Sequence, residues 1–561
     1  MTTIADIRRW NPALLDESID DLKREEDRLV RLDDELTASG KPANWQGEAA
    51  QAAADRHHEL GGDLRRLVVE VAAVRRALIG TVGDFEAVQR QLAEADALAS
   101  AYRFRILDDG RVEDLEHVVV GGPGSRLDDE DEHRIRTVRP DLVERVKRLL
   151  AQAEDADAEL TKVLRDADLD LMETKDGSLA DAAALGDARG LAETVEPPPP
   201  GTPADNARWW NSLPAETRAA MAEAPPAWLG GMDGIPASVR HTANVNRLDD
   251  ERAVLQAQAA QLRARLDKPY PGPGGRLQKG LDQDELQRVD EKLESLEKIG
   301  QVMERGNRQL LVLDSSGERM KAAVAIGDVD KASHVAVFTP GMESAIEKGS
   351  LASYDQSMNM VQADAQALVA REGGSVATVT WMGYEAPQLD ETLDPADSVA
   401  ADNAARRGAN ALADFYRGIN ESRDEDPHLV AVGHSYGSST TGFALQQEGT
   451  GVDSAVVMGS PGLGTPHHTT IDVPEGQLYN LESKWDPVAD FGRFGADPSN
   501  MPGVDNLATG DAVAVDGRQL RESSGHSTGG GYGYLDKGTT SQYNVSVIVA
   551  GKPDLAVDAR G

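Results

Sequence analysis

One serine of this 561-residue chain stands in a pattern that makes a hydroxyl group reactive. Ser435 is the centre of Gly433-His434-Ser435-Tyr436-Gly437. An apolar run at 428–432 precedes this pentapeptide and a Ser/Thr-rich stretch follows it, which predicts a strand, a sharp turn and a helix. Glycines suit both flanks of such a turn, because the serine backbone is strained and packed closely against its neighbours. We therefore predict that Ser435 is a nucleophile.

A serine hydroxyl attacks a carbonyl group readily only when a base takes its proton, so a histidine and an orienting carboxylate are also required. Asp486 follows the apolar run at 478–481, and His526 lies in a later loop. The three residues then occur in the order Ser, Asp, His, and we predict that they form a catalytic triad. The alternatives are Asp490 for the acid and His467 or His468 for the base.

Acyl transfer also needs hydrogen-bond donors for the oxygen that becomes negative in the transition state. The residue after the nucleophile supplies one backbone N–H group, and that residue is Tyr436. A loop after an early strand supplies the other, and Thr339-Pro340-Gly341-Met342 follows the apolar run at 334–338. We expect Met342 to donate through its main chain, with Gly341 allowing the close approach.

From about residue 309 onward, short β-branched runs alternate with helical stretches. This alternation is typical of strand–helix–strand units around a mostly parallel sheet. The predicted fold class of residues 309–552, the catalytic domain, is α/β, with helices flanking the sheet. The expected strands are 310–313, 322–326, 334–338, 376–381, 429–432, 455–458, 478–481 and, last, 544–549.

The N-terminal part of the chain is expected to be a separate all-α helical hairpin. Apolar residues recur at helical spacing over 18–36 and over 60–92, with Gly40 and Pro42 between the two patterns. Two antiparallel helices follow from this spacing. The bend between them contains Asn44-Trp45-Gln46-Gly47.

Residues 1–105 resemble the small helical-hairpin proteins of type VII secretion, whose Trp-x-Gly motif lies at the hairpin bend. The resemblance implies that another helical-hairpin protein is a partner. The chain departs from that family's export signal, in which an acidic residue lies four positions after a Tyr, because Ile106 follows Tyr102 at this distance. The alternative is an ordinary α-hairpin whose Trp fills the bend.

Three further segments complete the predicted organisation. Residues 106–195 are expected to be mixed but mainly helical, with a short hairpin near its start that turns at Asp109-Gly110. Residues 196–205 are predicted to be a linker, because consecutive prolines cannot enter a helix or a central strand. Residues 206–308 are expected to form a helical region ahead of the catalytic domain.

Residues from about 205 to 550 resemble an actinobacterial α/β-hydrolase family of unknown function, whose members often follow Trp-x-Gly hairpins. The resemblance implies an α/β-hydrolase fold and a serine hydrolase, and it implies no particular substrate. The residues that carry it are Trp209-Trp210, Asp233-Gly234-Ile235-Pro236 with Arg240 and Asn244, Thr339-Pro340-Gly341-Met342, Trp381 with Tyr384, Gly433-His434-Ser435-Tyr436-Gly437, and Gly459-Ser460-Pro461-Gly462.

Composition excludes several classes of protein. The formal net charge of −38 repels phosphate backbones, so we do not expect nucleic acid as a partner. The chain has no Cys, which excludes disulfides and thiolate metal sites, and we expect neither a metal nor a cofactor. No run approaches about 18 consecutive apolar residues, so stable membrane insertion is not expected. No Sec signal peptide is visible either, which predicts a cytoplasmic protein or one exported by a type VII-like route.

These features predict a cofactor-free serine hydrolase. In this prediction His526 activates Ser435, Asp486 orients His526, and the main-chain N–H groups of Tyr436 and Met342 hold the oxyanion. Carboxylic esters, including lipid esters, are the expected substrates by analogy with the fold. The alternative is an interaction or effector protein of type VII secretion that uses a hydrolase-like scaffold.

Overall fold

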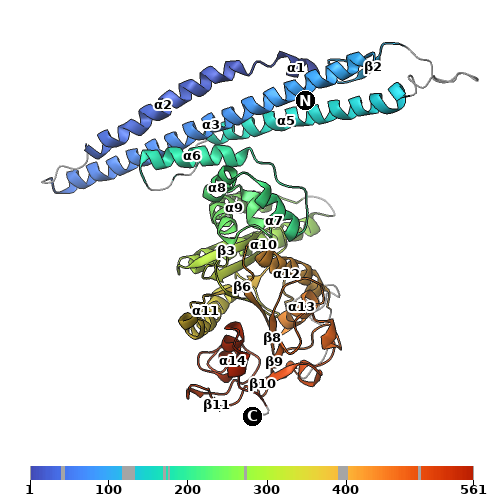
Figure 1. The fold of residues 1–561 in the computed structure, drawn as a ribbon. Coiled ribbons are helices and arrows are strands. Elements are labelled where there is room, and N and C mark those ends of the chain that lie inside the picture. The colour runs from blue at the N-terminus through green and yellow to red at the C-terminus, as the bar shows by residue number, and fades with distance from the viewer. Residues whose placement is uncertain are drawn as a thin grey trace, which may run out of the picture. The chain divides into compact units, whose positions relative to one another are not determined.

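The computed structural model forms two compact units (Figure 1). Unit 1 comprises Met1–Pro197 and Pro214–Ala224, and unit 2 comprises Pro198–Leu213 and Pro225–Gly561. The structure describes residues 2–38, 45–116, 133–168, 172, 174, 177–270, 274–388, 402–489 and 494–559. Within these residues, no helix has both the length and the apolar character needed to cross a membrane.

Unit 1 is mainly helical. The two long helices expected from the apolar spacing are present as α2 and α3, and the bend at 39–44 lies outside the described residues. The short hairpin β1–β2 is also present, with Phe104 paired to Asp114. The elements are α1 (Ile4–Arg9), α2 (Ala13–Ala38), α3 (Glu48–Ala101), β1 (Phe104–Ile106), β2 (Val112–Asp114), the π-helix η1 (Arg134–Val138), α5 (Arg139–Asp168), α6 (Leu179–Glu193) and α8 (Ala215–Glu223).

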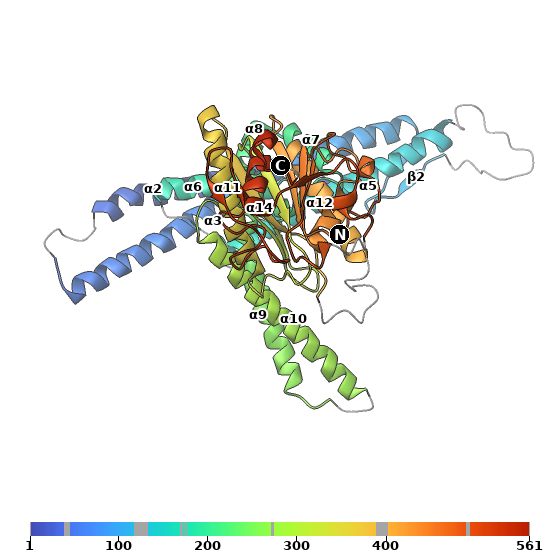
Figure 2. The ribbon, with the colours of Figure 1, turned by 90° about the horizontal axis from the view of Figure 1, so that it is seen from below.

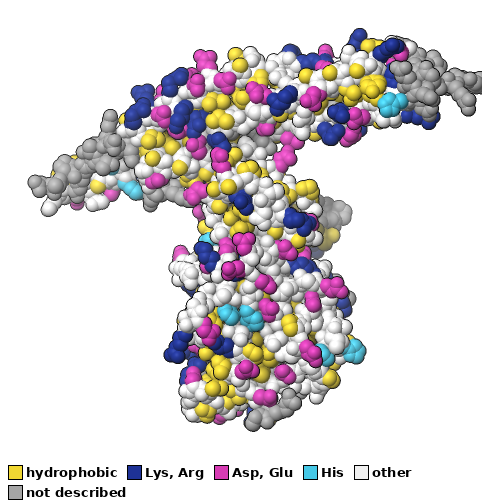
Figure 3. Space-filling view, viewed as in Figure 1, with side chains coloured by type: hydrophobic (Ala, Val, Ile, Leu, Met, Phe, Trp, Pro, Cys, Tyr) yellow, Lys and Arg dark blue, Asp and Glu magenta, His cyan; other side chains and the backbone are white. Residues whose placement is uncertain are grey.

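Helices α2 and α3 are antiparallel and are held by polar as well as apolar contacts. Arg75 of α3 donates to Glu26 of α2 at 2.7 Å, and both side chains are largely buried. Near the other end of the pair, the ring of Trp10 stacks on that of Phe85 with a centroid separation of 4.0 Å. Elsewhere on the visible face of the molecule, acidic and basic side chains are interspersed (Figure 3).

Helix α6 approaches α3 very closely, because glycines stand at the contact. A Cβ atom at Gly186 would lie 2.4 Å from the carbonyl oxygen of Val69. A Cβ atom at Gly190 would lie 2.4 Å from the carbonyl oxygen of Ala73. The two glycines are four residues apart and therefore lie on the same face of α6, where they let the two backbones touch.

Unit 2 is built around an eight-stranded sheet with the order β10-β9-β8-β7-β5-β6-β4-β3. Neighbouring strands are parallel from β10 to β6, and β4 is antiparallel to both of its neighbours. The strands are β3 (Arg308–Asp314), β4 (Lys321–Ile326), β5 (His334–Thr339), β6 (Val376–Met382), β7 (His428–His434), β8 (Ser454–Met458), β9 (Leu478–Leu481) and β10 (Asp505–Leu507); a separate pair is β11 (Ala512–Val513) with β12 (Gln519–Leu520).

Helices cover both faces of this sheet, which explains why its central strands are mostly apolar and almost wholly buried. Helices α11 and α14 pack on one face, and α12 and α13 pack on the other (Figure 1). The antiparallel pair α9–α10 extends from the sheet edge (Figure 2). The helices of unit 2 are α7 (Pro203–Ser212), η2 (Ala227–Gly231), α9 (Ala237–Leu266), α10 (Gly275–Met303), α11 (Ser350–Val369), η3 (Ala370–Glu372), α12 (Asn403–Glu421), α13 (Tyr436–Ala444), η5 (His468–Thr470), η7 (Pro498–Asn500), α14 (Thr540–Val549) and η8 (Pro553–Leu555).

The last expected strand, 544–549, was a wrong prediction, because these residues belong to helix α14. Their β-branched side chains favour a strand when the segment is considered alone. Three apolar residues, Val545, Ile548 and Val549, nevertheless recur at helical spacing and lie in the core. Thr539 caps the helix by accepting the N–H of Gln542. Burial of the whole helix against the sheet therefore outweighs local propensity.

The motif residues that precede the sheet fasten α9 to edge strand β3. The buried Arg240 forms an ion pair with the partly exposed Asp233 at 2.7 Å and donates to the carbonyl oxygen of Leu311 at 2.8 Å. Asn244 donates to the carbonyl oxygens of Gly230 and Leu310. These side chains satisfy backbone groups at the sheet edge and therefore have a structural role.

Candidate active site

Ser435 is the single residue between strand β7, which ends at His434, and helix α13, which begins at Tyr436. Its φ of 54° and ψ of −132° lie in a region that non-glycine residues rarely adopt. The N–H of Ser435 donates to Met458 at 2.9 Å, and its carbonyl oxygen accepts from the N–H of Ser438 at 2.9 Å. The strained turn thus places the side chain at the carboxyl ends of the parallel strands, where α/β proteins bind their ligands.

The two glycines of the pentapeptide are required by space. A Cβ atom at Gly437 would lie 2.3 Å from the carbonyl oxygen of Thr339, and one at Gly433 would lie 2.7 Å from Cα of Ser438. Either contact is too short for a side chain to fit. The glycines therefore allow the helix that follows Ser435 to pack directly on strands β7 and β5.

Ser435, His526 and Asp486 lie in hydrogen-bonding distance of one another in that order. Oγ of Ser435 is 2.6 Å from Nε2 of His526. Nδ1 of the same ring is 2.8 Å from Oδ1 and 2.9 Å from Oδ2 of Asp486. Ser435 and Asp486 are buried, whereas the His526 side chain is 28% exposed. The structure therefore brings together three residues from separate segments of the chain, at the carboxyl ends of the parallel strands.

The environment of Asp486 keeps its carboxyl group ionised. Burial raises its pKa, but the hydrogen bond and charge of His526, the hydroxyl of Tyr534 and the N–H of Val488 together hold the pKa below its ordinary value. Tyr534 donates to Oδ2 at 2.7 Å, and Val488 donates to Oδ1 at 2.9 Å. A charged carboxylate on Nδ1 leaves Nε2 of His526 as the acceptor for the serine proton.

A glycine after strand β8 makes room for this carboxylate and imidazole. Gly459 has a φ of +54°, and a Cβ atom there would lie 2.5 Å from Oδ2 of Asp486 and 3.0 Å from Nδ1 of His526. The adjacent Ser460 accepts a hydrogen bond from Ser438 at 2.7 Å. The Gly-Ser-Pro-Gly motif that begins at Gly459 therefore shapes the site from the neighbouring strand.

The loop after β5 lies directly against the nucleophile. A Cβ atom at Gly341 would lie 2.6 Å from Cβ and 3.0 Å from Oγ of Ser435. Tyr384 holds the loop by donating its hydroxyl to the carbonyl oxygen of Pro340 at 2.7 Å. Met342 follows Gly341 in this loop, and Tyr436 opens helix α13, where N–H groups point out of the helix terminus. Both expected oxyanion donors thus belong to segments that border Ser435.

The two alternative bases do not share this arrangement, and the alternative acid cannot be compared. Asp490 lies outside the described residues. His467 is exposed and directly precedes the short helix η5, to which its side chain makes no capping hydrogen bond. His468 packs at Gly503, where a Cβ atom would lie 2.5 Å from its ring. The base whose ring contacts Ser435 is His526.

Comparison with known proteins places this site in a recognised family. Residues 315–496 match the family model described as alpha/beta hydrolase, a span that includes Ser435 and Asp486 and ends before His526. An uncharacterised protein of Mycobacterium bovis is 34% identical over 216 residues, which cover 36% of this chain and 78% of that protein. The chain belongs to the α/β-hydrolase family.

Other relatives share a larger part of this chain. An uncharacterised protein of Mycobacterium tuberculosis is 29% identical over 310 residues, or 54% of this chain, and the chain spans 46% of its length. Among solved structures, the chain is similar to dienelactone hydrolase from Anabaena variabilis, with 14% identity and a TM-score of 0.27 over 45% of this chain and all of that one. The mycobacterial relatives are uncharacterised, so they transfer no substrate to this chain.

Two residues beside Ser435, His526 and Asp486 were not predicted from the sequence. The hydroxyl of Tyr534 bonds to Asp486, which lies 48 residues earlier in the chain. Nε2 of His434 lies 2.8 Å from the carbonyl oxygen of His526. Burial and the nearby His526 ring lower the pKa of His434 to about 3, so its ring is neutral and donates through Nε2. No local sequence pattern marks either contact, because each depends on distant loops meeting.

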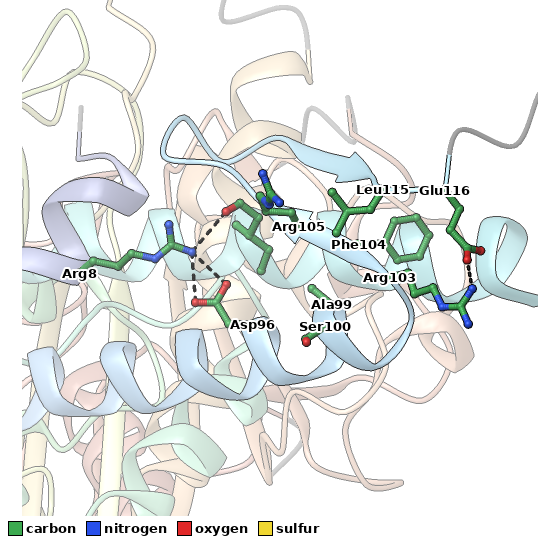
Figure 4. A pocket seen from close by; sticks show the side chains of 10 residues that line it. Arg8, Asp96, Ala99, Ser100, Arg103, Phe104, Arg105, Leu115 and Glu116 are labelled. Atoms are coloured by element: carbon green, nitrogen blue, oxygen red, sulfur yellow. Dashed lines mark hydrogen bonds and ion pairs between the residues drawn. The ribbon is translucent and has the colours of Figure 1, made fainter.

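Several hollows in the described part of the chain have the size of ligand sites. One of about 600 Å³ lies beside Asp486 and is lined in part by Lys484 and by Trp485, which is 78% exposed. Another, of about 580 Å³, lies in unit 1 between α1, α3 and the β1–β2 hairpin (Figure 4). In the second hollow the Arg8 guanidinium points to Asp96 and bonds to it at 2.9 Å, so its charge is already neutralised.

The residues that the structure describes contain no group of three or more His, Asp or Glu side chains arranged to hold a metal ion.

Proposed function

We propose that this α/β hydrolase is a serine hydrolase that cleaves carboxylic esters through an acyl-enzyme. The proposal rests on one observation, the 2.6 Å approach of Nε2 of His526 to Oγ of Ser435 while Asp486 engages Nδ1 of the same ring. This arrangement gives the hydroxyl a base and gives the base a fixed tautomer. Acyl transfer is the chemistry that needs both, together with oxyanion donors.

The steps follow from these positions. His526 takes the proton of Ser435 as Oγ attacks the ester carbonyl carbon, and Asp486 stabilises the imidazolium that forms. The main-chain N–H groups of Tyr436 and Met342 bind the oxygen as its charge develops. His526 then returns the proton to the departing alkoxide, leaving an acyl group on Ser435. Water, deprotonated by His526, releases the acid and restores the serine.

The proposed substrates are a narrower class than the mechanism alone requires. We propose carboxylic esters, including lipid esters, because an alkoxide leaves more readily than an amide nitrogen. The analogy of fold favours the same class. Hydrolysis rates of p-nitrophenyl esters from acetate to palmitate would define the preferred acyl length.

Labelling with a fluorophosphonate probe tests the proposal directly. The wild-type chain should be modified at Ser435, and Ser435→Ala should not be labelled. Ser438→Ala is the matched control and should still be labelled. Ser438 is a buried serine three residues away, and its Oγ bonds to the carbonyl oxygen of Ser435 and to Oγ of Ser460 instead of to a histidine. Folded wild-type protein that takes up no probe and hydrolyses no ester would exclude the serine hydrolase mechanism.

A further inference from the structure

We propose that Tyr534 is a positioning residue of this hydrolase. Its hydroxyl holds the ionised carboxylate of Asp486 in place, so that Asp486 can orient His526. The proposal rests on the proposed function, since it concerns the same triad. Tyr534 touches no reacting atom. It acts through the carboxylate, and its effect should therefore appear in the rate and its pH dependence and not in substrate binding.

The hydroxyl of Tyr534 has one available direction for its proton. Its oxygen accepts the N–H of Ser483 at 2.8 Å, and the same oxygen lies 2.7 Å from Oδ2 of Asp486. Because the ionised carboxylate cannot donate, the hydroxyl must donate to it. Burial and the charge of Asp486 raise the pKa of Tyr534, so the hydroxyl keeps its proton across the working pH range.

The donors to Asp486 divide between its two oxygens. Oδ1 accepts the N–H of Val488 at 2.9 Å as well as Nδ1 of His526 at 2.8 Å. Oδ2 lies 2.9 Å from the same Nδ1, so the two oxygens share its proton. Among the described residues, the hydroxyl of Tyr534 donates the other hydrogen bond to Oδ2. Without the hydroxyl, Oδ2 would be a buried oxygen that depends on a shared proton alone. Such an oxygen is costly, and the carboxyl group would rotate or take up a proton more easily.

Tyr534 also ties the acid to the loop that carries the base. Its side chain is fully buried in the core between the sheet and α14. Its backbone N–H donates to the carbonyl oxygen of Ser527 at 3.0 Å, one residue beyond His526. The carbonyl oxygen of Tyr534 accepts the hydroxyl of Ser541 in α14 at 2.7 Å. One rigid residue therefore fixes the acid by its hydroxyl and the histidine loop by its main chain.

Tyr534→Phe tests the hydroxyl alone. We expect kcat for a soluble p-nitrophenyl ester to fall by about tenfold to a hundredfold, the effect of losing one hydrogen bond to a charged group, with KM within about twofold. The acidic limb of the kcat/KM profile, which reports protonation of the base, should move to higher pH. A carboxylate that accepts one hydrogen bond fewer is more basic and attracts the proton on the neighbouring imidazolium more strongly. Rates are normalised to the fraction of sites labelled by fluorophosphonate, so that unfolded protein does not contribute.

Tyr543→Phe is the matched control. Tyr543 is buried, and its hydroxyl donates to the carbonyl oxygen of Leu555 at 3.1 Å without contacting the triad. We expect it to lower thermal stability about as much as Tyr534→Phe while leaving kcat and the acidic limb unchanged. Equal kcat values for wild type and Tyr534→Phe, or a loss of activity without a shift of the acidic limb, would overturn the positioning role.

A spectroscopic measurement separates failure of this inference from failure of the proposed function. In wild-type protein the proton shared by Nδ1 of His526 and Asp486 should give a downfield proton NMR resonance, identified by its loss in His526→Ala. Tyr534→Phe should move this resonance, even if no ester is hydrolysed. If the resonance stays in place in Tyr534→Phe, the inference about Tyr534 is wrong whether or not the chain is an enzyme.

Discussion

The carboxylate of Asp486 binds Nδ1 of His526 through both of its oxygens, at 2.8 and 2.9 Å, although the two residues are 40 positions apart. The same carboxylate is buried and its pKa is held below the ordinary value by His526, Tyr534 and Val488. A buried anion this well supported is arranged to stabilise a positive charge on its neighbour. In the proposed mechanism that charge appears on His526 when Ser435 attacks.

Asp486→Asn should therefore lower kcat by about 10⁴-fold while the protein stays folded. An amide in place of the carboxylate can accept at one position only, so it favours the wrong tautomer of His526 and leaves the imidazolium unsupported. Steady-state rates on p-nitrophenyl butyrate measure the loss, with circular dichroism to verify folding. A variant that retains more than about a tenth of wild-type kcat would show that another group orients the base.

The lowered pKa of His434 predicts how the free energy of unfolding depends on pH. Its folded-state pKa is lowered from 6.5 to about 3, so between these values the unfolded chain binds a proton that the folded chain does not. Stability must then fall as pH is lowered from about 6.5 toward about 3. His434→Gln retains a donor for the carbonyl oxygen of His526 but takes up no proton. Urea unfolding from pH 7 to pH 4 should show a smaller loss of stability in the variant, and parallel curves would contradict this assignment.

Gly341→Ala tests the loop that faces the nucleophile. The new methyl group would lie 2.6 Å from Cβ of Ser435, so the loop must retreat and carry the main chain of Met342 with it. We expect kcat/KM to fall by about a hundredfold to a thousandfold, the effect of losing one oxyanion donor. Gly300→Ala on α10 is the control, because no atom lies within 4 Å of the added Cβ. Equal activity in both variants would remove this loop from the oxyanion site.

Much of unit 2 could be predicted from the sequence, because its strands are buried on both faces. The runs that form β5 and β7 are apolar almost throughout, and the pentapeptide after β7 fixes where the turn falls. Chain order, together with a position after an apolar run, led to Asp486 and His526, and in the structure His526 lies within hydrogen-bonding distance of Ser435 and of Asp486. Helix α14 was read as a strand, since its β-branched residues carry no local sign that Thr539 caps a helix. Tyr534 could not be predicted, because its contact with Asp486 joins two segments that are distant in the sequence and meet only in the folded chain.

The packing of α6 on α3 in unit 1 gives a prediction that is independent of catalysis. A methyl group at Gly186 would meet the carbonyl oxygen of Val69 at 2.4 Å, so Gly186→Ala must push the two helices apart. We expect it to destabilise the chain by about 1–3 kcal/mol, measured by urea unfolding. Gly62→Ala in α3 provides the contrast, since nothing lies within 4 Å of its added Cβ.

That contrast separates close packing from the general cost of glycine in a helix. Gly62→Ala should stabilise unit 1 by about 0.5–1 kcal/mol, because alanine loses less backbone entropy on folding. Ester hydrolysis should remain at the wild-type rate in both variants, since Ser435, Asp486 and His526 all belong to unit 2. If Gly186→Ala is as stabilising as Gly62→Ala, the backbones of α6 and α3 do not lie as close together as the space around Gly186 indicates.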